Sequence, residues 1–289
     1  MDDMKQKLRG LLARLPIDRF RNPPPVVGVI RLDGVIGRGA GLGRQGLSLD
    51  SHERAIAKLF GDSRIRAVAL MINSPGGSPV QSALIARRIR DLADEKDLPV
   101  VAFCEDVAAS GGYWLACAAD EIFADENSIV GSIGVISAGF GFVDLIERIG
   151  VERRVYATGP RKGMLDPFQD EKSTDIDRLR ELHADIFENF KNHVRRCRGD
   201  RLRAADETLF TGDIWTGRQA VEVGLIDGLA DMRGEMRKRY GDKVKFQRAD
   251  VRHGLLSRLR GGMSGRAGMD PGALIGALDD WAQWKRFRL

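Results

Sequence analysis

The sequence predicts an α/β fold in which mostly parallel strands alternate with helices. From residue 26 onward, short apolar runs of strand length alternate with longer segments whose apolar residues recur at helical spacing. Repeated strand–helix pairing of this kind is typical of a parallel sheet covered by helices. The chain has 289 residues, of which 43% are hydrophobic and 30% charged, so it is long and apolar enough to bury such a core.

The first half of the pattern supplies three strands and three helices. The prolines at 23–25 end an N-terminal helix and precede the first strand. In chain order we expect a strand at 26–32, a helix at about 50–61, a strand at 67–72, a helix at about 79–95, a strand at 100–103 and a helix beginning at Ser110. The glycine-rich stretch 34–46 lacks the spacing of a dinucleotide fingerprint, and no Gly-Lys-Ser/Thr follows it. We therefore interpret it as a surface loop and expect no cofactor.

The second half continues with shorter strands. Strands are predicted at 121–124, 133–137 and 151–156, with a helix between the last two and a long helix at about 173–197. Residues 214–247 then provide a further helix–helix–strand passage, and 271–288 provide a terminal amphipathic helix.

The positive charge of the chain is concentrated near its two ends. The net charge is +5, but residues 1–21 carry six basic and three acidic side chains and residues 233–268 carry eleven and three, so the remainder is acidic. We divide the chain into a basic amphipathic helix at 1–22, a main domain at 23–250, and a basic linker with a C-terminal helix at 251–289. The first helix could lie on an anionic membrane surface or pack within the assembly, and the sequence leaves both alternatives open.

Several classes of protein are not expected. No apolar run approaches the ~18 residues of a membrane span, and the N-terminus lacks a secretory signal, so we expect a cytoplasmic protein with at most peripheral contact on the inner face of the membrane. The three cysteines are too few and wrongly spaced for a disulfide framework or a zinc site, and we expect no metal. No aromatic residues are interleaved with the arginines of 233–260 in a stacking pattern, so nucleic acid is not an expected partner.

Two loops at the ends of neighbouring strands carry the residues of a nucleophilic site. Residues 73–78 follow the strand 67–72, and residues 105–110 follow the strand 100–103, so both loops are expected at one edge of the sheet. Ser110 then stands at the positive end of a helix, where a developing oxyanion is favoured. The N–H groups of Gly76, Gly77 and Gly111 are candidates for an oxyanion hole.

Ser110 also has a purely structural interpretation, because serine is among the best helix N-caps. Gly111 and Gly112 directly after it lower helix stability, which favours a site where something must approach closely. The four histidines have no evident Asp or Glu partner for a Ser-His-Asp arrangement. A buried lysine can replace histidine as a base, and Lys162 lies in a loop dense in turn residues, 158–168, that could fold over a cleft.

Four ordered motifs between residues 26 and 229 resemble those of the signal peptide peptidase A family, within the ClpP/crotonase-like superfamily. They are Asn73-Ser74-Pro75-Gly76-Gly77, Ala109-Ser110-Gly111-Gly112-Tyr113, Gly131-Ser132-Ile133-Gly134-Val135, and Gly159 with Lys162 and Asp166-Pro167-Phe168. The resemblance implies a domain of repeated β-β-α units in a spiral, with flanking helices. It also implies that Ser110 is the nucleophile, that Lys162 is the general base, and that Ser132 orients the lysine.

The resemblance further implies an endopeptidase acting on hydrophobic peptides such as signal-peptide remnants. Members of the family often carry an N-terminal membrane anchor, which we do not expect here. This chain has one copy of the domain where others have two in tandem, so we expect a homo-oligomeric ring in which neighbours complete each site. Two alternatives remain: a crotonase-type acyl-CoA enzyme with the same fold and oxyanion hole, and a non-catalytic scaffold at the membrane edge. Neither needs both Ser110 and Lys162.

Overall fold

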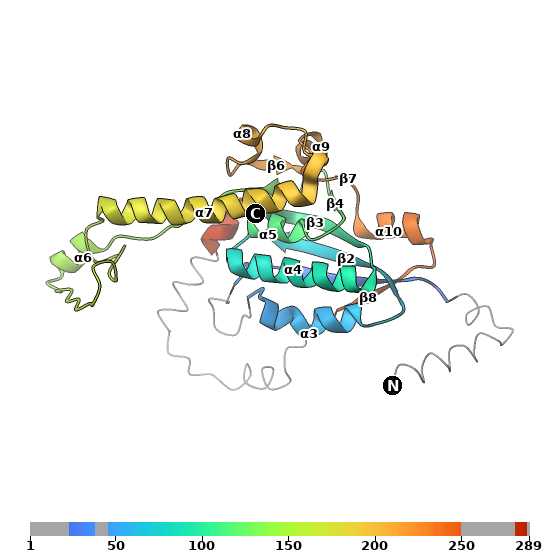
Figure 1. Cartoon of the computed structure of the whole chain (residues 1–289), viewed down its shortest axis with the longest axis horizontal. Helices are drawn as coiled ribbons and strands as arrows, with labels where there is room; N and C mark the ends of the chain where they lie inside the picture. Colours follow the sequence, from blue (N-terminus) through green and yellow to red (C-terminus); the bar gives the residue numbers. More distant parts are fainter. Residues whose placement is uncertain (1–22, 38–45, 250–280, 288–289) are drawn as a thin grey trace.

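The predicted α/β class is confirmed by the computed structural model, which describes residues 23–37, 46–249 and 281–287. A twisted sheet forms the centre, and helices lie against both of its faces (Figure 1). The predicted N-terminal helix, most of the glycine-rich stretch and the basic linker lie outside the described residues. Of the terminal helix predicted at 271–288, the structure describes only residues 281–287, and 281–285 are helical.

The strands are β1 (Val26–Asp33), β2 (Ile65–Ser74), β3 (Val100–Ala109), β4 (Glu121–Ala124), β5 (Ile129–Gly131), β6 (Ile214–Thr216), β7 (Gly228–Leu229) and β8 (Lys245–Arg248). The helices are α3 (Leu49–Phe60), α4 (Pro79–Lys96), α5 (Gly111–Ala116), α6 (Val143–Arg148), α7 (Ser173–Arg198), α8 (Asp206–Leu209), α9 (Gly217–Glu222) and α10 (Met232–Tyr240), with a 3-10 turn η1 at Gly199–Arg201. The long helices predicted at 50–61, 79–95 and 173–197 are confirmed as α3, α4 and α7 to within one residue at each end.

The strands follow the order β6-β5-β3-β2-β1-β8, and β4 joins β3 to β7 off this path. Every pairing is parallel except that of β5 with β6, as the repeated strand–helix pattern predicted. Strand β3 runs well beyond the predicted residues 100–103 because its two halves have different partners. Its first half pairs with β4 and its second half with β5, which carries the strand up to Ala109.

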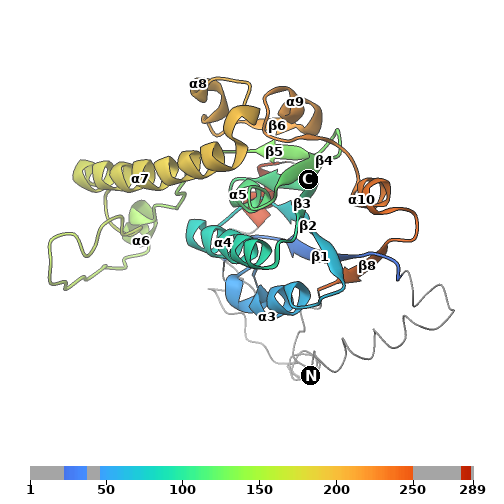
Figure 2. The same ribbon diagram turned by 45° about the vertical axis from the view of Figure 1, so that its right-hand side comes forward.

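Both faces of the central strands are buried. Helices α3, α4 and α5 cover one face together with the main core cluster, and α10 covers part of the other through Met236 (Figures 1 and 2). Strands covered on both faces read as continuous apolar runs, which is why Ile65–Ser74 lacks a polar alternation. The parallel arrangement then brings the carboxyl ends of β2, β3 and β5 together at one edge.

Two predicted strands are wrong. Residues 133–137 are not a strand, because the segment that pairs with β3 lies earlier, at Ile129–Gly131, and the chain turns sharply at Ser132. Residues 151–156 are not a strand either, and all six are exposed. The helix predicted between them is confirmed as α6.

We call residues 136–172 the arm, because they extend from the body beside the N-terminal half of α7 (Figures 1 and 2). The arm has its own small set of contacts. The Phe142 N–H donates to the Pro167 carbonyl at 2.7 Å, the rings of Phe142 and Phe168 lie 5.5 Å apart, and Arg153 pairs with Asp166 at 3.1 Å. The Asp166-Pro167-Phe168 motif therefore builds the part of the arm that holds the loop of Lys162.

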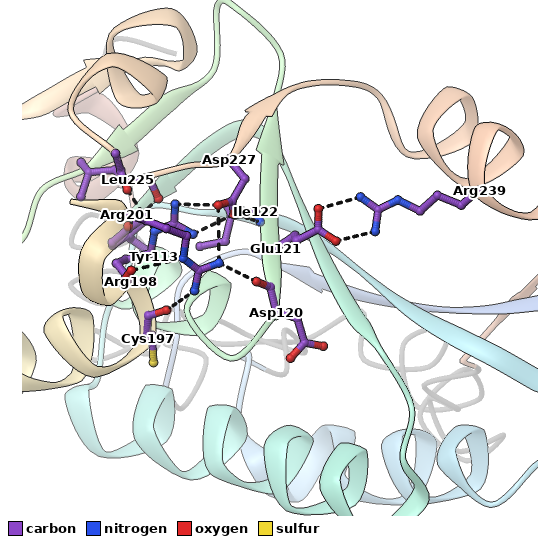
Figure 3. A network of polar contacts seen from close by, with 11 residues as sticks. Tyr113, Asp120, Glu121, Ile122, Cys197, Arg198, Arg201, Leu225, Asp227 and Arg239 are labelled. Carbon is purple, nitrogen blue, oxygen red and sulfur yellow. Dashed lines mark hydrogen bonds and ion pairs between the residues drawn. The ribbon is translucent and has the colours of Figure 1, made fainter. Parts of the chain in front are cut away.

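A buried polar network ties α7 to the helix that begins at Ser110 (Figure 3). The Arg198 side chain, 1% exposed, donates to Asp227 at 2.7 and 3.0 Å and to the Gly224 carbonyl at 3.0 Å. Burial disfavours the charge of Asp227, but the hydrogen bonds from Arg198 and the Ile122 N–H, together with the charges of Arg198 and Arg201, outweigh it, so the pKa of Asp227 is lowered. The hydroxyl of Tyr113 donates to the Leu225 carbonyl at 2.6 Å, so α5 is fixed to the same segment.

Candidate active site

Ser110 lies on a sharp strand-to-helix turn. Its φ of 52° and ψ of −120° place it in a backbone region that glycine usually occupies, and such strain typically costs ~1–3 kcal/mol. The N–H of Ser110 donates to the Gly131 carbonyl at 2.7 Å, which holds the turn. Its side chain makes no capping hydrogen bond, so the N-cap interpretation is wrong. Ser110 instead lines a cleft.

The two predicted loops do face each other. A Cβ atom on Gly76 would lie 2.7 Å from the Cβ of Ser110, and one on Gly77 would lie 2.1 Å from the carbonyl oxygen of Ile36. Both glycines have positive φ, 111° and 137°. Only glycine can take this path between Ile36 and Ser110 without displacing backbone.

The N–H groups near Ser110 differ in whether they are occupied. The Gly76 N–H donates to the Ser74 hydroxyl at 3.2 Å, so it is engaged within its own loop. The N–H groups of Gly77 and Gly111 have no acceptor among the residues that the structure describes. Both residues line the cleft with Ser110. Two unoccupied donors beside a strained serine are what an oxyanion hole requires.

Other parts of the chain approach Gly111 and Gly112 closely, as expected from the two glycines. A Cβ on Gly111 would lie 2.5 Å from the Ser82 hydroxyl on α4, and one on Gly112 would lie 2.5 Å from the Ser74 carbonyl on β2. Helix α5 thus begins in contact with both elements. Of the two glycines, Gly111 also lines the cleft.

Ser132 lies next to Ser110 at the ends of paired strands. Ala109 of β3 is in register with Gly131 of β5, so the following serines are neighbours. Ser132 is 3% exposed, has a φ of 51°, and donates its N–H to the Asp213 carbonyl at 2.6 Å. A second strained serine is therefore held beside the first.

Lys162 is not brought to Ser110 within one chain. It is exposed, it lies on the arm, and it is absent from the lining of the cleft. Its N–H donates to the Gly159 carbonyl at 3.2 Å in a turn of the arm. The single chain therefore assembles Ser110, Ser132 and the glycine donors, and it holds the predicted base elsewhere.

The cleft at Ser110 has a volume of about 690 Å³ and mostly apolar walls. One wall comes from α7 through Ile186 and Phe190, and another from the C-terminal segment through Ala282 and Arg286. These residues were not among the predicted site residues. The four-residue spacing of Ile186 and Phe190 on a helix was a usable signal, whereas nothing in the sequence places 281–287 near Ser110.

His193 supports the aromatic wall of the cleft. Its ring stacks on Trp114 with centroids 4.6 Å apart, and Phe190 lies 5.0 Å from the same indole. The Nε2–H of His193 donates at 3.1 Å to the Trp114 carbonyl, one of the last carbonyls of α5 that lack a helical partner. Burial lowers the pKa of His193 to about 4, so the ring is neutral at pH 7.

This lowered pKa predicts a pH-dependent loss of stability. Between pH 6.5 and 4 the unfolded chain binds a proton at His193 that the folded protein does not, so the free energy of unfolding decreases as the pH is lowered through this window. The contribution is at most about 1.4 kcal/mol per pH unit. His193→Gln keeps an amide donor for the Trp114 carbonyl and removes the titration. Urea unfolding at several pH values should show that the free energy of unfolding changes less with pH in the variant than in the wild type. An equal pH dependence in the two proteins would contradict the assignment to His193.

No group of three or more His, Cys, Asp or Glu side chains is arranged to hold a metal ion within residues 23–37, 46–249 and 281–287. The chemistry available at the cleft is that of a serine hydroxyl with two unoccupied backbone donors. The model of peptidase family S49 matches residues 93–243, slightly more than half of the chain. The chain belongs to peptidase family S49. The matched segment of this S49 chain contains Ser110, Ser132 and Lys162, whereas Gly76 and Gly77 precede it.

Relatives of this S49 chain confirm the predicted resemblance to signal peptide peptidase A. "Serine protease SPPA, chloroplastic" from Arabidopsis thaliana is 32% identical over 71% of this chain and 31% of its own length. "Protease 4" from Haemophilus influenzae is 30% identical over 83% of this chain and 38% of its own. A protein of Brucella abortus named "Na(+)/H(+) antiporter NhaA" is 52% identical over 92% of this chain and 36% of its own. The chain spans about a third of the length of each of these relatives.

In the described part of this S49 chain, no helix has both the length and the hydropathy that crossing a bilayer requires.

Proposed function

We propose that this S49 chain is a serine endopeptidase in which Ser110 is the nucleophile and Lys162 the general base, acting on signal-peptide remnants or other hydrophobic peptides. The observation that carries the proposal is the strained turn at Ser110 beside the unoccupied N–H groups of Gly77 and Gly111. A crotonase-type enzyme would use the same donors, but it would have no use for the strained serine. The apolar walls of the cleft support a hydrophobic peptide as substrate.

The geometry supports a two-step acyl transfer. The Ser110 oxygen attacks the peptide carbonyl carbon while the neutral amine of Lys162 accepts the hydroxyl proton. The carbonyl oxygen becomes an anion held by the N–H groups of Gly77 and Gly111. When the tetrahedral intermediate collapses, the C–N bond breaks and the lysine gives its proton to the leaving amine. Water then attacks the acyl-enzyme by the same route, releasing the acid and restoring Ser110.

We propose that Lys162 reaches this site from a neighbouring copy of the chain. Apolar side chains along the arm are exposed, as on a surface that has lost its partner; they are Ile136, Phe140, Leu145, Ile149, Val151, Val155 and Tyr156. Val80 and Leu84 on α4 are also exposed, 64% and 37%, and lie beside the cleft residue Pro79. An arm from one protomer that covers α4 of the next would bury both surfaces and supply the lysine. The same burial would favour the neutral amine that a base requires.

In this arrangement Ser132 would receive the incoming amine. It lies beside Ser110 and is held by the backbone of Asp213, so its hydroxyl could orient Lys162 toward the nucleophile. The predicted ring follows if each protomer gives an arm to one neighbour and receives one from the other. Contact of residues 1–22 with anionic membranes stays a prediction, since these residues lie outside the described part.

A fluorophosphonate probe tests the proposed function. Such probes react covalently with an activated serine, so the full chain should be labelled, and peptide mapping should find the label on Ser110. Ser128, a buried serine directly before β5 whose hydroxyl donates to the Cys104 carbonyl, is the matched control residue. Ser110→Ala should abolish labelling and Ser128→Ala should retain it. Absence of labelling in the assembled wild-type protein would favour the acyl-CoA enzyme or the scaffold.

A further inference from the structure

Arg286 is the one charged residue among the described residues that line the cleft at Ser110. All other lining residues are apolar, small or uncharged. The chain contains 41 acidic residues, and many of its arginines pair with one of them, as Arg198 does with Asp227 and Arg239 with Glu121. Arg286 makes no ion pair within the described part of the chain, and its only ring contact is with the adjacent Phe287, at 5.9 Å.

The segment that carries Arg286 is anchored behind the nucleophile. Phe287 is 6% exposed and forms a small core with Val107 and Ala109 on β3, directly before Ser110, while Trp284 packs against the same cluster. Figures 1 and 2 show the segment in red, close to α5. The anchor fixes the distance between this segment and the catalytic turn.

The anchor also determines which side chains face the cleft. Residues 281–285 are helical, so Trp284 and Phe287 lie on one face, and Ala282 and Arg286, four residues apart, lie on another. The Arg286 N–H donates to the Ala282 carbonyl at 3.2 Å, which continues the turn. Ala282, Gln283 and Arg286 line the cleft, whereas Lys285 does not, and its ammonium lies 5.7 Å from the ring of Trp281.

An arginine that lines a mostly apolar cleft, is exposed, and has no ion-pair partner among the described residues is suited to bind an anion of the ligand. Its planar fork matches a carboxylate, and because Arg286 is exposed the attraction is screened by solvent and weakens as salt is added. We propose that Arg286 is a specificity-determining residue that binds a carboxylate of the peptide substrate. The assignment rests on the proposed peptidase function. The carboxylate has two sources in a peptide, an Asp or Glu side chain and the C-terminal carboxylate.

Two pairs of quenched fluorescent peptides with an apolar core test this proposal in the assembled full-length protein. One pair differs by Glu or Gln at a single position, scanned along the peptide with an amidated C-terminus. The other pair has no acidic side chain and differs by a free or an amidated C-terminus. We expect kcat/KM to be about tenfold higher for the acid than for its amide in one pair at low salt, and this ratio to shrink as salt is added. The pair of peptides that shows the preference identifies whether the bound carboxylate is a side chain or the C-terminus.

Variants of the segment assign the preference to Arg286. Arg286→Gln should bring the ratio close to one, Arg286→Lys should keep it above one, and Arg286→Glu should favour a peptide with Lys at the same position. Lys285→Gln removes a neighbouring charge that does not line the cleft, and it should leave the ratio at the wild-type value. A wild-type ratio near one, or an unchanged ratio in Arg286→Gln, would overturn the proposal. Loss of all hydrolysis in both Arg286→Gln and Arg286→Lys would also overturn it, by showing a role in the fold.

Failure of this inference can be separated from failure of the proposed function. If Ser110→Ala hydrolysed the peptides at the wild-type rate, the peptidase assignment would fail whatever the ratio. If hydrolysis depends on Ser110 and the acid and amide peptides are cleaved equally, only the role of Arg286 is refuted.

Discussion

Ser110→Ala is expected to reduce peptide hydrolysis by several orders of magnitude, with kcat carrying the loss. The variant lacks one oxygen, and that oxygen makes no capping hydrogen bond, so the turn, the cleft and the N–H donors should persist. Steady-state hydrolysis of an apolar fluorescent peptide measures the effect. A folded variant that retained a tenth of the wild-type kcat would remove Ser110 from the role of nucleophile.

Ser110→Gly is the matched companion to this variant. It should be as inactive as Ser110→Ala, because it also lacks the hydroxyl. Glycine adopts a φ of 52° without strain, so its free energy of unfolding should exceed that of the alanine variant by about 1 kcal/mol. Denaturant unfolding of the two inactive variants therefore measures the strain at the turn separately from catalysis. Equal stabilities would show that the turn stores no such strain.

The second large effect is complementation between two inactive variants. Lys162→Ala should be as inactive as Ser110→Ala, and Lys162→Arg should not restore activity, because arginine keeps its proton. If Lys162 comes from a neighbour, a mixed assembly contains some sites with an intact Ser110 and an intact lysine. Unfolding the two variants together and refolding them should therefore recover a substantial fraction of wild-type activity.

Controls for this experiment follow from the same geometry. Each variant refolded alone should stay inactive, and the double variant Ser110→Ala, Lys162→Ala should not complement Ser110→Ala. Arg161→Ala changes the residue beside Lys162 on the exposed arm and should retain activity by itself. Light scattering on the active fractions should give a mass well above the 31.9 kDa of one chain. A fully active monomer, or mixtures that never regain activity, would refute a base supplied in trans.

The part of the site that could be predicted from sequence is the part fixed by sheet topology. Residues that follow neighbouring parallel strands meet at one edge, so the glycine loop and Ser110 could be placed together before any coordinates were known. The pairing of Ala109 with Gly131 extends the same rule to Ser132. Which glycine N–H is free could not be predicted, because it depends on the Ser74 hydroxyl engaging Gly76.

The strand wrongly predicted at 151–156 has a physical cause. Apolar periodicity shows that a segment will be buried, but it does not show what will bury it. Val151, Val155 and Tyr156 read as a strand of the sheet, yet they stand exposed on the arm, where a second chain is the proposed cover. The position of Arg286 was beyond prediction for a related reason. Among the lysines and arginines of the described residues, the packing of Phe287 on β3 is what places Arg286 at the cleft.

The separation of Lys162 from Ser110 within one chain has a consequence for how such a peptidase would be restrained in a cell. If the base is supplied by a neighbour, a newly made chain would not cleave the polypeptides around it. Encounter with other copies would then be the activation step, so at low abundance the rate of hydrolysis would rise more steeply than the amount of protein. Dilution would inactivate the enzyme reversibly, and subunit concentration would control its activity.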